Sequence, residues 1–255
     1  MSLSLWYKIL IMEYPFQKIE HKVYKNTFLQ NVRVKLCFDP IKYHENKDKQ
    51  KALEAFVEDK FNLKLDDNTK NGLRIFANNM QTSLNFTENF FELMIGRKNY
   101  KSFDESVNPF LSIGLDFIRN VVGNSLNGII IRKYDVWPYK DQKLSMECLL
   151  KSIFSKELLS NDMFNSSENK NIIQCISEKS FDIDEQIALK LKYGFIKGTD
   201  VKAKDEGQII LDSTIERDGT INVDDVDDNC RQLNQILFDS YHWAVCENIV
   251  KIMEE

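Results

Sequence analysis

The residues best suited to binding an anion lie just before a predicted helix. Arg97, Lys98 and Lys101 flank Tyr100, and Ser102 follows as the predicted cap of that helix. Because backbone N–H groups at a helix N-terminus attract negative charge, cations beside them predict an anion-binding loop. A solvated strand-to-helix loop would contain the same residues, since charged loop side chains mostly contact water. Both interpretations fit the sequence.

A second candidate site lies on a predicted strand that contains Arg132 and Tyr134. With Asp212 of a later strand, these side chains would line a ligand pocket. The alternative is a structural ion pair between Arg132 and Asp135 or Asp212, because such pairs are common in folded proteins. The candidate ligand-binding residues are therefore Arg97, Lys98, Tyr100, Arg132, Tyr134 and Asp212.

The other residues capable of chemistry show no catalytic or metal-binding spacing. The acidic residues Asp224, Asp225, Asp227 and Asp228 lack a calcium-loop pattern, and the first two complement a helix dipole. The three histidines, His21, His44 and His242, share no ligand spacing, and the five cysteines form no recognisable Cys–His motif. Walker, GxGxxG, GxSxG and HExxH motifs are absent from the sequence. We expect no catalytic residue, metal or cofactor.

Composition restricts the class of protein. The chain has 255 residues and 43% hydrophobic content, and no Pro/Gly/Ser-rich linker divides it, so we expect one domain over 1–255. The net charge of -5 gives no global attraction to nucleic acid or anionic membranes, although it is compatible with a local basic patch. The odd number of widely spaced cysteines fits a reducing cytoplasm.

The first residues are apolar but do not predict a membrane segment. The stretch 3–12 is short, is interrupted by Lys8, and lacks a basic region and a cleavage site. It therefore predicts neither a signal peptide nor a membrane span. Residues 1–14 are interpreted as a leader or a poorly ordered segment.

The clearest structural signal is an amphipathic helix over 103–122. Ser102 and Glu105 have capping-box spacing at its start, and Gly123-Asn124 ends it. The apolar residues on one face are Phe103, Val107, Phe110, Leu111, Leu115, Ile118 and Val122. Flanking strands are the simplest cover for this face. Before the helix, alternation predicts a strand at 31–39, a helix at 47–61, and two strands within 73–95 around a turn at 87–89.

After this helix we expect a strand at 126–137, ended by Pro138 because proline cannot donate to a ladder. The further predicted elements are a helix at 144–159, a loop at 160–171, strands at 172–181, 186–197 and 208–217, a tight turn at Asp218-Gly219, and a helix from Asn222 to about Met253. Together they predict a two-layer α+β fold, with a mainly antiparallel sheet and helices on one face. The first six elements match a ferredoxin-like β-α-β-β-α-β unit, followed by further strands and a long C-terminal helix.

Four segments resemble a sporadically distributed family of prokaryotic proteins that has no established activity. The segments are VYKNTFLQNVRVKLCFDP, FFELMIGRKNYKSFDESV, IIIRKYDVW and IILDSTIE, the last leading into the long final helix. Tyr100, Phe103, Arg132, Tyr134, Leu211 and Asp212 occupy the places of the family's motifs. Asn234 departs from the pattern, since the family often has a histidine there. The resemblance covers most of the chain and implies fold and length, but no mechanism.

Three functions are compatible with these observations. The first is a non-catalytic binding or interaction protein with a protein partner, as an accessory component of a mobile-element or defence-type gene cluster. The second is an enzyme or sensor that binds a phosphorylated small molecule or nucleotide through Arg97, Lys98 and Arg132. The third is a nucleic-acid-binding module that uses lysines on the wet face of the sheet, namely Lys190, Lys192 and Lys197; the acidic balance counts against it.

Overall fold

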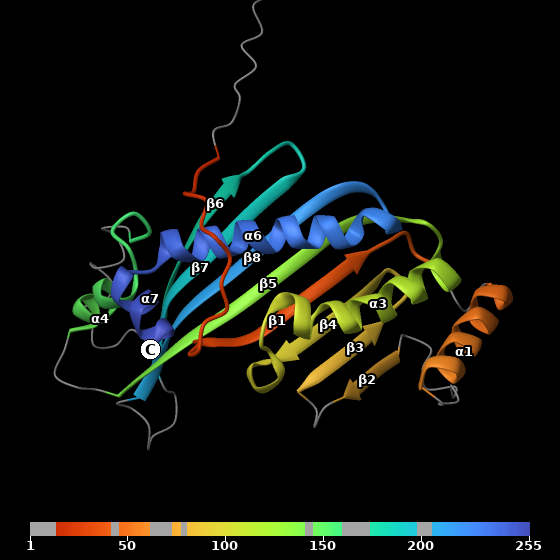
Figure 1. Cartoon of the computed structure of the whole chain (residues 1–255), viewed down its shortest axis with the longest axis horizontal. Coiled ribbons are helices and arrows are strands. Elements are labelled where there is room, and N and C mark those ends of the chain that lie inside the picture. Colours follow the sequence, from red (N-terminus) through yellow and green to blue (C-terminus); the bar gives the residue numbers. More distant parts are fainter. Residues whose placement is uncertain are drawn as a thin grey trace, which may run out of the picture.

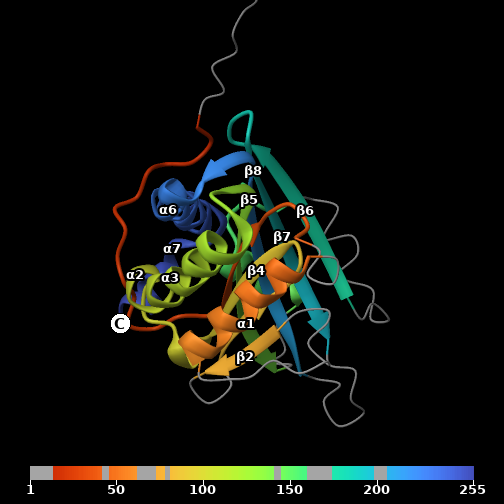
Figure 2. The ribbon, with the colours of Figure 1, turned by 90° about the vertical axis from the view of Figure 1, so that its right-hand side faces the viewer.

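One antiparallel sheet organises the molecule. The computed structural model describes residues 14–41, 46–61, 73–77, 81–140, 145–159, 174–197 and 206–255. Within these ranges eight strands pair in the order β2-β3-β4-β1-β5-β8-β7-β6. The helices lie on one face of the sheet, as Figure 1 and, from the side, Figure 2 show. The predicted α+β class and antiparallel sheet are confirmed; the expectations for 1–13 and 160–171 concern residues outside these ranges.

The first half of the sheet is built around β1 (Leu29–Cys37), which lies between β4 (Phe90–Gly96) and β5 (Ser125–Lys140). Alternation buries Val32, Val34 and Leu36 of β1 beneath the helices. The helix α1 (Lys47–Phe61) has the predicted bounds. Residues 73–96 contain three strands where two were predicted, because β2 (Leu73–Ala77) and β3 (Thr82–Phe86) are separate strands that pair with each other.

The second half extends from β5 through β8 (Glu206–Asn222) and β7 (Ile187–Lys197) to β6 (Gln174–Asp182). The prediction that Pro138 ends its strand is wrong, since Pro138 pairs with Gln208 and β5 continues to Lys140. The N–H of Val136 bonds to Phe28 on the β1 side, and the nitrogen of Pro138, two residues on, faces that same side. There β1 has already ended, so proline costs no ladder hydrogen bond.

The predicted turn at Asp218-Gly219 is also wrong. Between its pairs with Leu126 and Gly128, β8 has one more residue than β5, so this part of the strand is a bulge. Gly219 has φ 108°, a backbone conformation in the region that favours glycine. The bulge lets β8 continue to Asn222, whose side chain accepts a hydrogen bond of 3.0 Å from the N–H of Asp224.

The predicted helix over 103–122 is present in three pieces. They are α2 (Phe103–Ser106), α3 (Asn108–Phe117) and a π-helix (Ile118–Val122). The Ser102 hydroxyl caps the first piece by accepting from the Glu105 N–H at 3.1 Å, and Gly123 (φ 153°) follows the last. The predicted apolar face packs on the sheet. At Gly114 a Cβ would lie only 2.3 Å from the Phe91 ring, so α3 approaches β4 too closely for any larger residue.

The final helical region is broken where one helix was predicted. The helix α6 (Val226–Ala244) ends at an extended Val245, and α7 (Glu247–Glu254) follows. Val245 forms a β-bridge with Phe154, just after α4 (Met146–Ile153). The same bridge explains why α4 stops at Ile153 and does not reach 159. Of these helices, α6 is long and lies across β5 and β8 (Figure 1).

Candidate functional site

The two faces of β5 carry different polar residues. Register places Ile129, Ile131, Lys133 and Asp135 on the face that the helices cover, opposite Leu36, Val34, Val32 and Leu29 of β1. Arg132 and Tyr134 therefore project from the other, open face. A lysine and an aspartate thus occupy positions of a central strand where a covered sheet normally has apolar side chains.

Lys133 and Asp135 line a cavity of about 560 Å³. Its walls come from the sheet, α6, the loop before α2, and the extended segment 14–28, which we call the strap. The strap crosses α6 before it enters β1 (Figure 1). Apolar side chains form part of the wall, among them Leu29, Leu237, Phe238 and Met253. The volume falls within the range of small-molecule sites, which combine apolar walls with a few polar groups.

The charges of Lys133 and Asp135 are poorly compensated. Asp135 is 4% exposed, and within the described residues neither side chain has a hydrogen bond or ion pair. Burial lowers the pKa of Lys133 to about 8, an effect that the Asp135 charge opposes. Burial raises the pKa of Asp135 to about 7, against the attraction of Lys133. Asp135 is therefore largely removed from water, whereas Lys133 is partly exposed. A complementary ligand group would stabilise both charged forms.

Hydroxyl groups surround the same two residues. Ser213 of β8 pairs directly with Lys133, and its buried Oγ has no hydrogen-bond partner within the described residues. Tyr100 and Tyr241 also line the cavity. Burial and then the nearby charge of Asp135 raise the pKa of both phenols, so both hydroxyls remain protonated. The Tyr241 hydroxyl donates to Met253 Sδ at 3.1 Å, which leaves its oxygen lone pairs free to accept.

Asp239 of α6 holds the strap in place. Its carboxylate accepts hydrogen bonds from the Tyr14 hydroxyl at 2.6 Å, the Ile19 N–H at 3.0 Å and the Gln235 side chain at 2.8 Å. Nearer the cavity, the Tyr24 hydroxyl lies 2.6 Å from Nε2 of His242. Because Asp239 is buried and fully hydrogen-bonded, its role is structural: it fixes one wall of the cavity.

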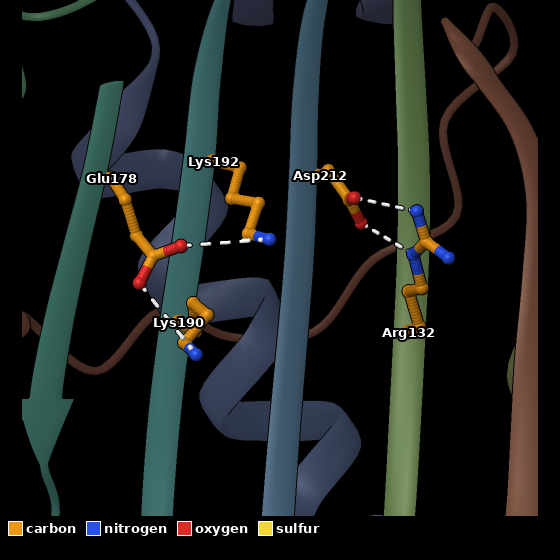
Figure 3. A network of polar contacts seen from close by, with 5 residues as sticks. All are labelled: Arg132, Glu178, Lys190, Lys192 and Asp212. Atoms are coloured by element: carbon orange, nitrogen blue, oxygen red, sulfur yellow. Dashed lines mark hydrogen bonds and ion pairs between the residues drawn. The ribbon is translucent and has the colours of Figure 1, made fainter. Parts of the chain in front are cut away.

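The open face of the sheet carries a balanced network of charges, shown in Figure 3. Arg132 donates two hydrogen bonds of 2.6 Å to the two carboxylate oxygens of Asp212. Lys190 and Lys192 lie 3.6 and 3.5 Å from the Glu178 carboxylate. A hollow of about 440 Å³ is lined by Arg132, Asp212, Lys190 and Lys192, and Glu216 adds a further negative charge to it. The cations here already have protein partners, so the hollow has little capacity to attract an anion.

The structure separates the candidate residues that the sequence suggested. Arg132, Tyr134 and Asp212 lie on the open face, and the predicted ion pair between Arg132 and Asp212 is present. Tyr100 lies in the cavity under the helices, on the opposite face. The remaining two, Arg97 and Lys98, are exposed in a 3-10 turn at Arg97–Asn99, outside both the cavity and the hollow. The expected convergence of Arg97, Lys98 and Arg132 does not occur.

Lys133 and Asp135 were missed by the sequence prediction, which selected their neighbours Arg132 and Tyr134. A signal was present, because the positions Ile129, Ile131, Lys133, Asp135 and Trp137 share one face of the strand. Two charges that interrupt an otherwise apolar series predict a buried polar site. The alternation of side chains along the strand does not show which face of the sheet the helices cover. Without that information, Lys133 and Asp135 could not be recognised as a pair on the covered face.

The described part of the chain shows neither a metal-binding cluster nor a helix that could span a membrane. No cluster of three or more His, Cys, Asp or Glu side chains there is arranged to hold a metal ion. Asp224, at the start of the last helical region, instead pairs with Arg119 at 2.9 Å. No helix among the described residues is long and apolar enough to cross a membrane.

Comparison with known proteins does not assign the chain to a family. The sequence matches no model of a known protein family, and it matches no curated protein.

Proposed function

We propose that this chain is a non-catalytic binding protein that holds a small molecule in the cavity between the sheet, α6 and the strap. One observation carries the proposal: Lys133 and Asp135 lie in the cavity, on the covered face, and within the described residues neither has a hydrogen bond or an ion pair. Burying unpaired charges costs several kcal/mol in general, so such residues are rarely kept for stability. A ligand that pairs with them offsets this cost.

The second function inferred from the sequence is binding of a phosphorylated small molecule. The cavity is a more suitable place for such a ligand than the surroundings of Arg97 or Arg132. Arg132 is neutralised by Asp212, whereas Lys133 has no ion pair within the described residues. Lys25 and Lys101 also line the cavity and would attract an acidic ligand. The buried carboxylate of Asp135 disfavours a multiply charged phosphate close to Lys133, because like charges in a poorly solvated site repel strongly.

The proposal is tested with paired variants on adjacent residues. Ser213→Leu places a larger side chain in the cavity, whereas Thr214→Leu places it on the open face. The protein is purified under native conditions, denatured, and the released small molecules are identified by mass spectrometry. We expect a stoichiometric ligand from the wild type and from Thr214→Leu, and none from Ser213→Leu.

A thermal-shift screen provides the independent measurement. Metabolites that include nucleotides, sugar phosphates, amino acids and organic acids are added to the purified protein. Compounds that bind raise the melting temperature of the wild type and of Thr214→Leu, but not of Ser213→Leu. The proposal fails if extraction yields no ligand and no compound raises the melting temperature.

We further propose a protein partner, an accessory role in a mobile-element or defence-type gene cluster, and a cytoplasmic location. Two observations support the protein partner and the accessory role. The sequence lacks the residue spacing of known catalytic motifs, and it resembles a sporadically distributed family. The cytoplasmic location is supported by the five cysteines, which are all free thiols. A pull-down from native cells tests whether a protein partner exists. If no protein is recovered, the proposal of a protein partner fails.

A ferredoxin-like unit is also proposed for the first half of the chain. The sheet order β3-β4-β1-β5, with helices following β1 and β4, supports it. The additional strand β2 at the edge is a departure from that unit.

A further inference from the structure

We infer that the ligand of the cavity is a zwitterion: one small molecule with an apolar body, an ammonium group that binds Asp135 and a carboxylate that binds Lys133. This inference rests on the proposed function. It follows from the pairing of one buried anion with one cation on the same face of a single strand. Residues two apart on a strand are about 6.6 Å apart at Cα, which leaves space for a ligand to bridge the two side chains.

The hydrogen-bonding groups around Asp135 match an ammonium. An ammonium has three N–H donors, and three acceptors are at hand: the Asp135 carboxylate and the phenolic oxygens of Tyr100 and Tyr241. Both phenols lie close enough to Asp135 to respond to its charge. A bound ammonium would therefore be fully hydrogen-bonded, as a buried charge requires.

The groups around Lys133 match a carboxylate. The Lys133 ammonium and the unpartnered hydroxyl of Ser213 are donors on directly paired residues of β5 and β8. A hydrogen bond from a charged donor such as this ammonium to a carboxylate is stronger than one between neutral groups. A ligand with only an acidic group would leave Asp135 unpaired, and a ligand with only an amine would leave Lys133 unpaired; both arrangements retain a buried charge without compensation.

The apolar wall defines the rest of the ligand. Leu29, Leu237, Phe238 and Met253 give the cavity an apolar wall beside the charged pair. An apolar amino acid or a dipeptide combines such a body with both charged groups. Nucleotides and sugar phosphates lack the ammonium and the apolar body, so they are the excluded classes.

Matched probes test the inference. Calorimetry measures the affinity of L-phenylalanine, of 3-phenylpropanoate, which lacks the ammonium, and of 2-phenylethylamine, which lacks the carboxylate. L-Tryptophan, L-leucine and the dipeptide Ala-Phe extend the zwitterionic series. We expect at least one zwitterion to bind at least about tenfold more tightly than its single-charge analogues, because each analogue leaves a buried partner unsatisfied.

Two variants assign each charge to its residue. Asp135→Asn should weaken zwitterion binding at least about tenfold and leave 3-phenylpropanoate unchanged or tighter. Lys133→Met should weaken the zwitterion and 3-phenylpropanoate, but not 2-phenylethylamine. Lys190→Met, on the open face, should change none of these affinities. The melting temperature of each variant verifies that it is folded.

The outcomes separate this inference from the proposed function. If 3-phenylpropanoate binds as tightly as the best zwitterion, or if only phosphorylated compounds bind, the zwitterion inference is overturned while the binding function stands. Binding of no zwitterion in the series also overturns it. If no compound of any class binds and none co-purifies, both fall.

Discussion

At the scale of single residues, stability alone does not explain why Lys133 and Asp135 lie on the covered face of the sheet. Most helix-side positions around them on the central strands are apolar or carry a small hydroxyl, such as Ile131, Val32 and Ser213. Arg132, one position away, shows the usual solution for a charge in a sheet, which is a bidentate partner. Its neighbour Lys133 has no such partner within the described residues, and the proposed site rests on this difference.

Lys133→Met should stabilise the free protein. The substitution keeps an unbranched side chain and removes a charge whose lowered pKa reports a desolvation cost. We expect the free energy of unfolding in urea at neutral pH to rise by about 1–3 kcal/mol. Lys190→Met, an exposed change on the open face, should alter it by less than about 0.5 kcal/mol. A loss of stability in Lys133→Met would show that the lysine has a structural partner.

Asp135 should make the protein less stable as the pH rises from about 4 to 7. Its pKa is raised from 3.8 to about 7, so in this window the folded state keeps a proton that the unfolded state has lost. Stability falls with pH wherever the folded state binds more protons. Asp135→Asn should therefore match the wild type near pH 4 and exceed it by about 2–4 kcal/mol near pH 8.

Urea denaturation across this pH range measures the difference between Asp135→Asn and the wild type. The groups near Asp135 are Lys133, Tyr100 and Tyr241, none of which titrates between pH 4 and 7. His21 also lines the cavity, and its pKa is lowered, first by burial and then by Lys133, which gives a pH dependence of opposite sign. His21→Gln is the control for that contribution. Parallel curves for Asp135→Asn and the wild type would show that the carboxyl is not buried.

At the scale of elements, α6 and the strap together form two walls of the cavity. The helix supplies Leu237, Phe238 and Tyr241 to the wall, and through Asp239 it also fixes the strap that forms the opposite side. The backbone N–H of Asn26 bonds to the Met253 carbonyl of α7, so the break at Val245 allows the last helix to hold the end of the strap. Segments far apart in the chain thus line one space.

Asp239→Ala should release the strap from α6. The change leaves the Tyr14 hydroxyl and the Ile19 N–H without their acceptor, at a cost of about 1–3 kcal/mol in stability. We expect the amides of residues 14–28 to exchange with deuterium at least about tenfold faster, while those of β1 and β5 keep their protection. Asp227→Ala, an exposed change on the same helix, should leave exchange in the strap unchanged. Unchanged exchange in Asp239→Ala would mean that other contacts hold the strap.

At the scale of the whole molecule, the two faces of the sheet have different properties. The helices cover one face and enclose the cavity, whereas the other face is lined with alternating cations and anions (Figures 2 and 3). On the open face, Arg132 pairs with Asp212, Lys190 and Lys192 lie near Glu178, and Glu216 lines the hollow. This balance keeps the local potential low, which argues against a nucleic-acid surface.

We therefore expect no binding of DNA duplex or single-stranded RNA by fluorescence anisotropy at micromolar protein and low salt, where phosphate contacts are strongest. Glu178→Gln provides a sensitive control, because it removes the partner of Lys190 and Lys192. Of the wild type and this variant, only Glu178→Gln should show any affinity for nucleic acid. Salt-sensitive binding by the wild type that is lost in Lys192→Glu would restore the nucleic-acid hypothesis.

Local patterns predicted the elements well. The α1 bounds, the Ser102 cap, the turn at 87–89 and the apolar face of the 103–122 helix depend on neighbouring residues, so periodicity and capping chemistry indicate them. The errors at Pro138, Asp218-Gly219 and Val245 have a different cause. Each was decided by a distant partner: the end of β1, the register of β5 and the bridge to Phe154.

By itself, the sequence determined the α+β class and a strand over 129–137 that contains the charged residues Arg132, Lys133 and Asp135. Only the tertiary structure decided which of those charges are buried, because alternation gives two faces without saying which one the helices cover. That choice placed Arg132 beside Asp212 on the open face. It placed Lys133 and Asp135 under α6 and the strap, where neither has a hydrogen bond or an ion pair within the described residues. A site assembled from β5, β8, α6 and residues 14–28 depends on contacts between distant parts of the chain, and no local pattern records them.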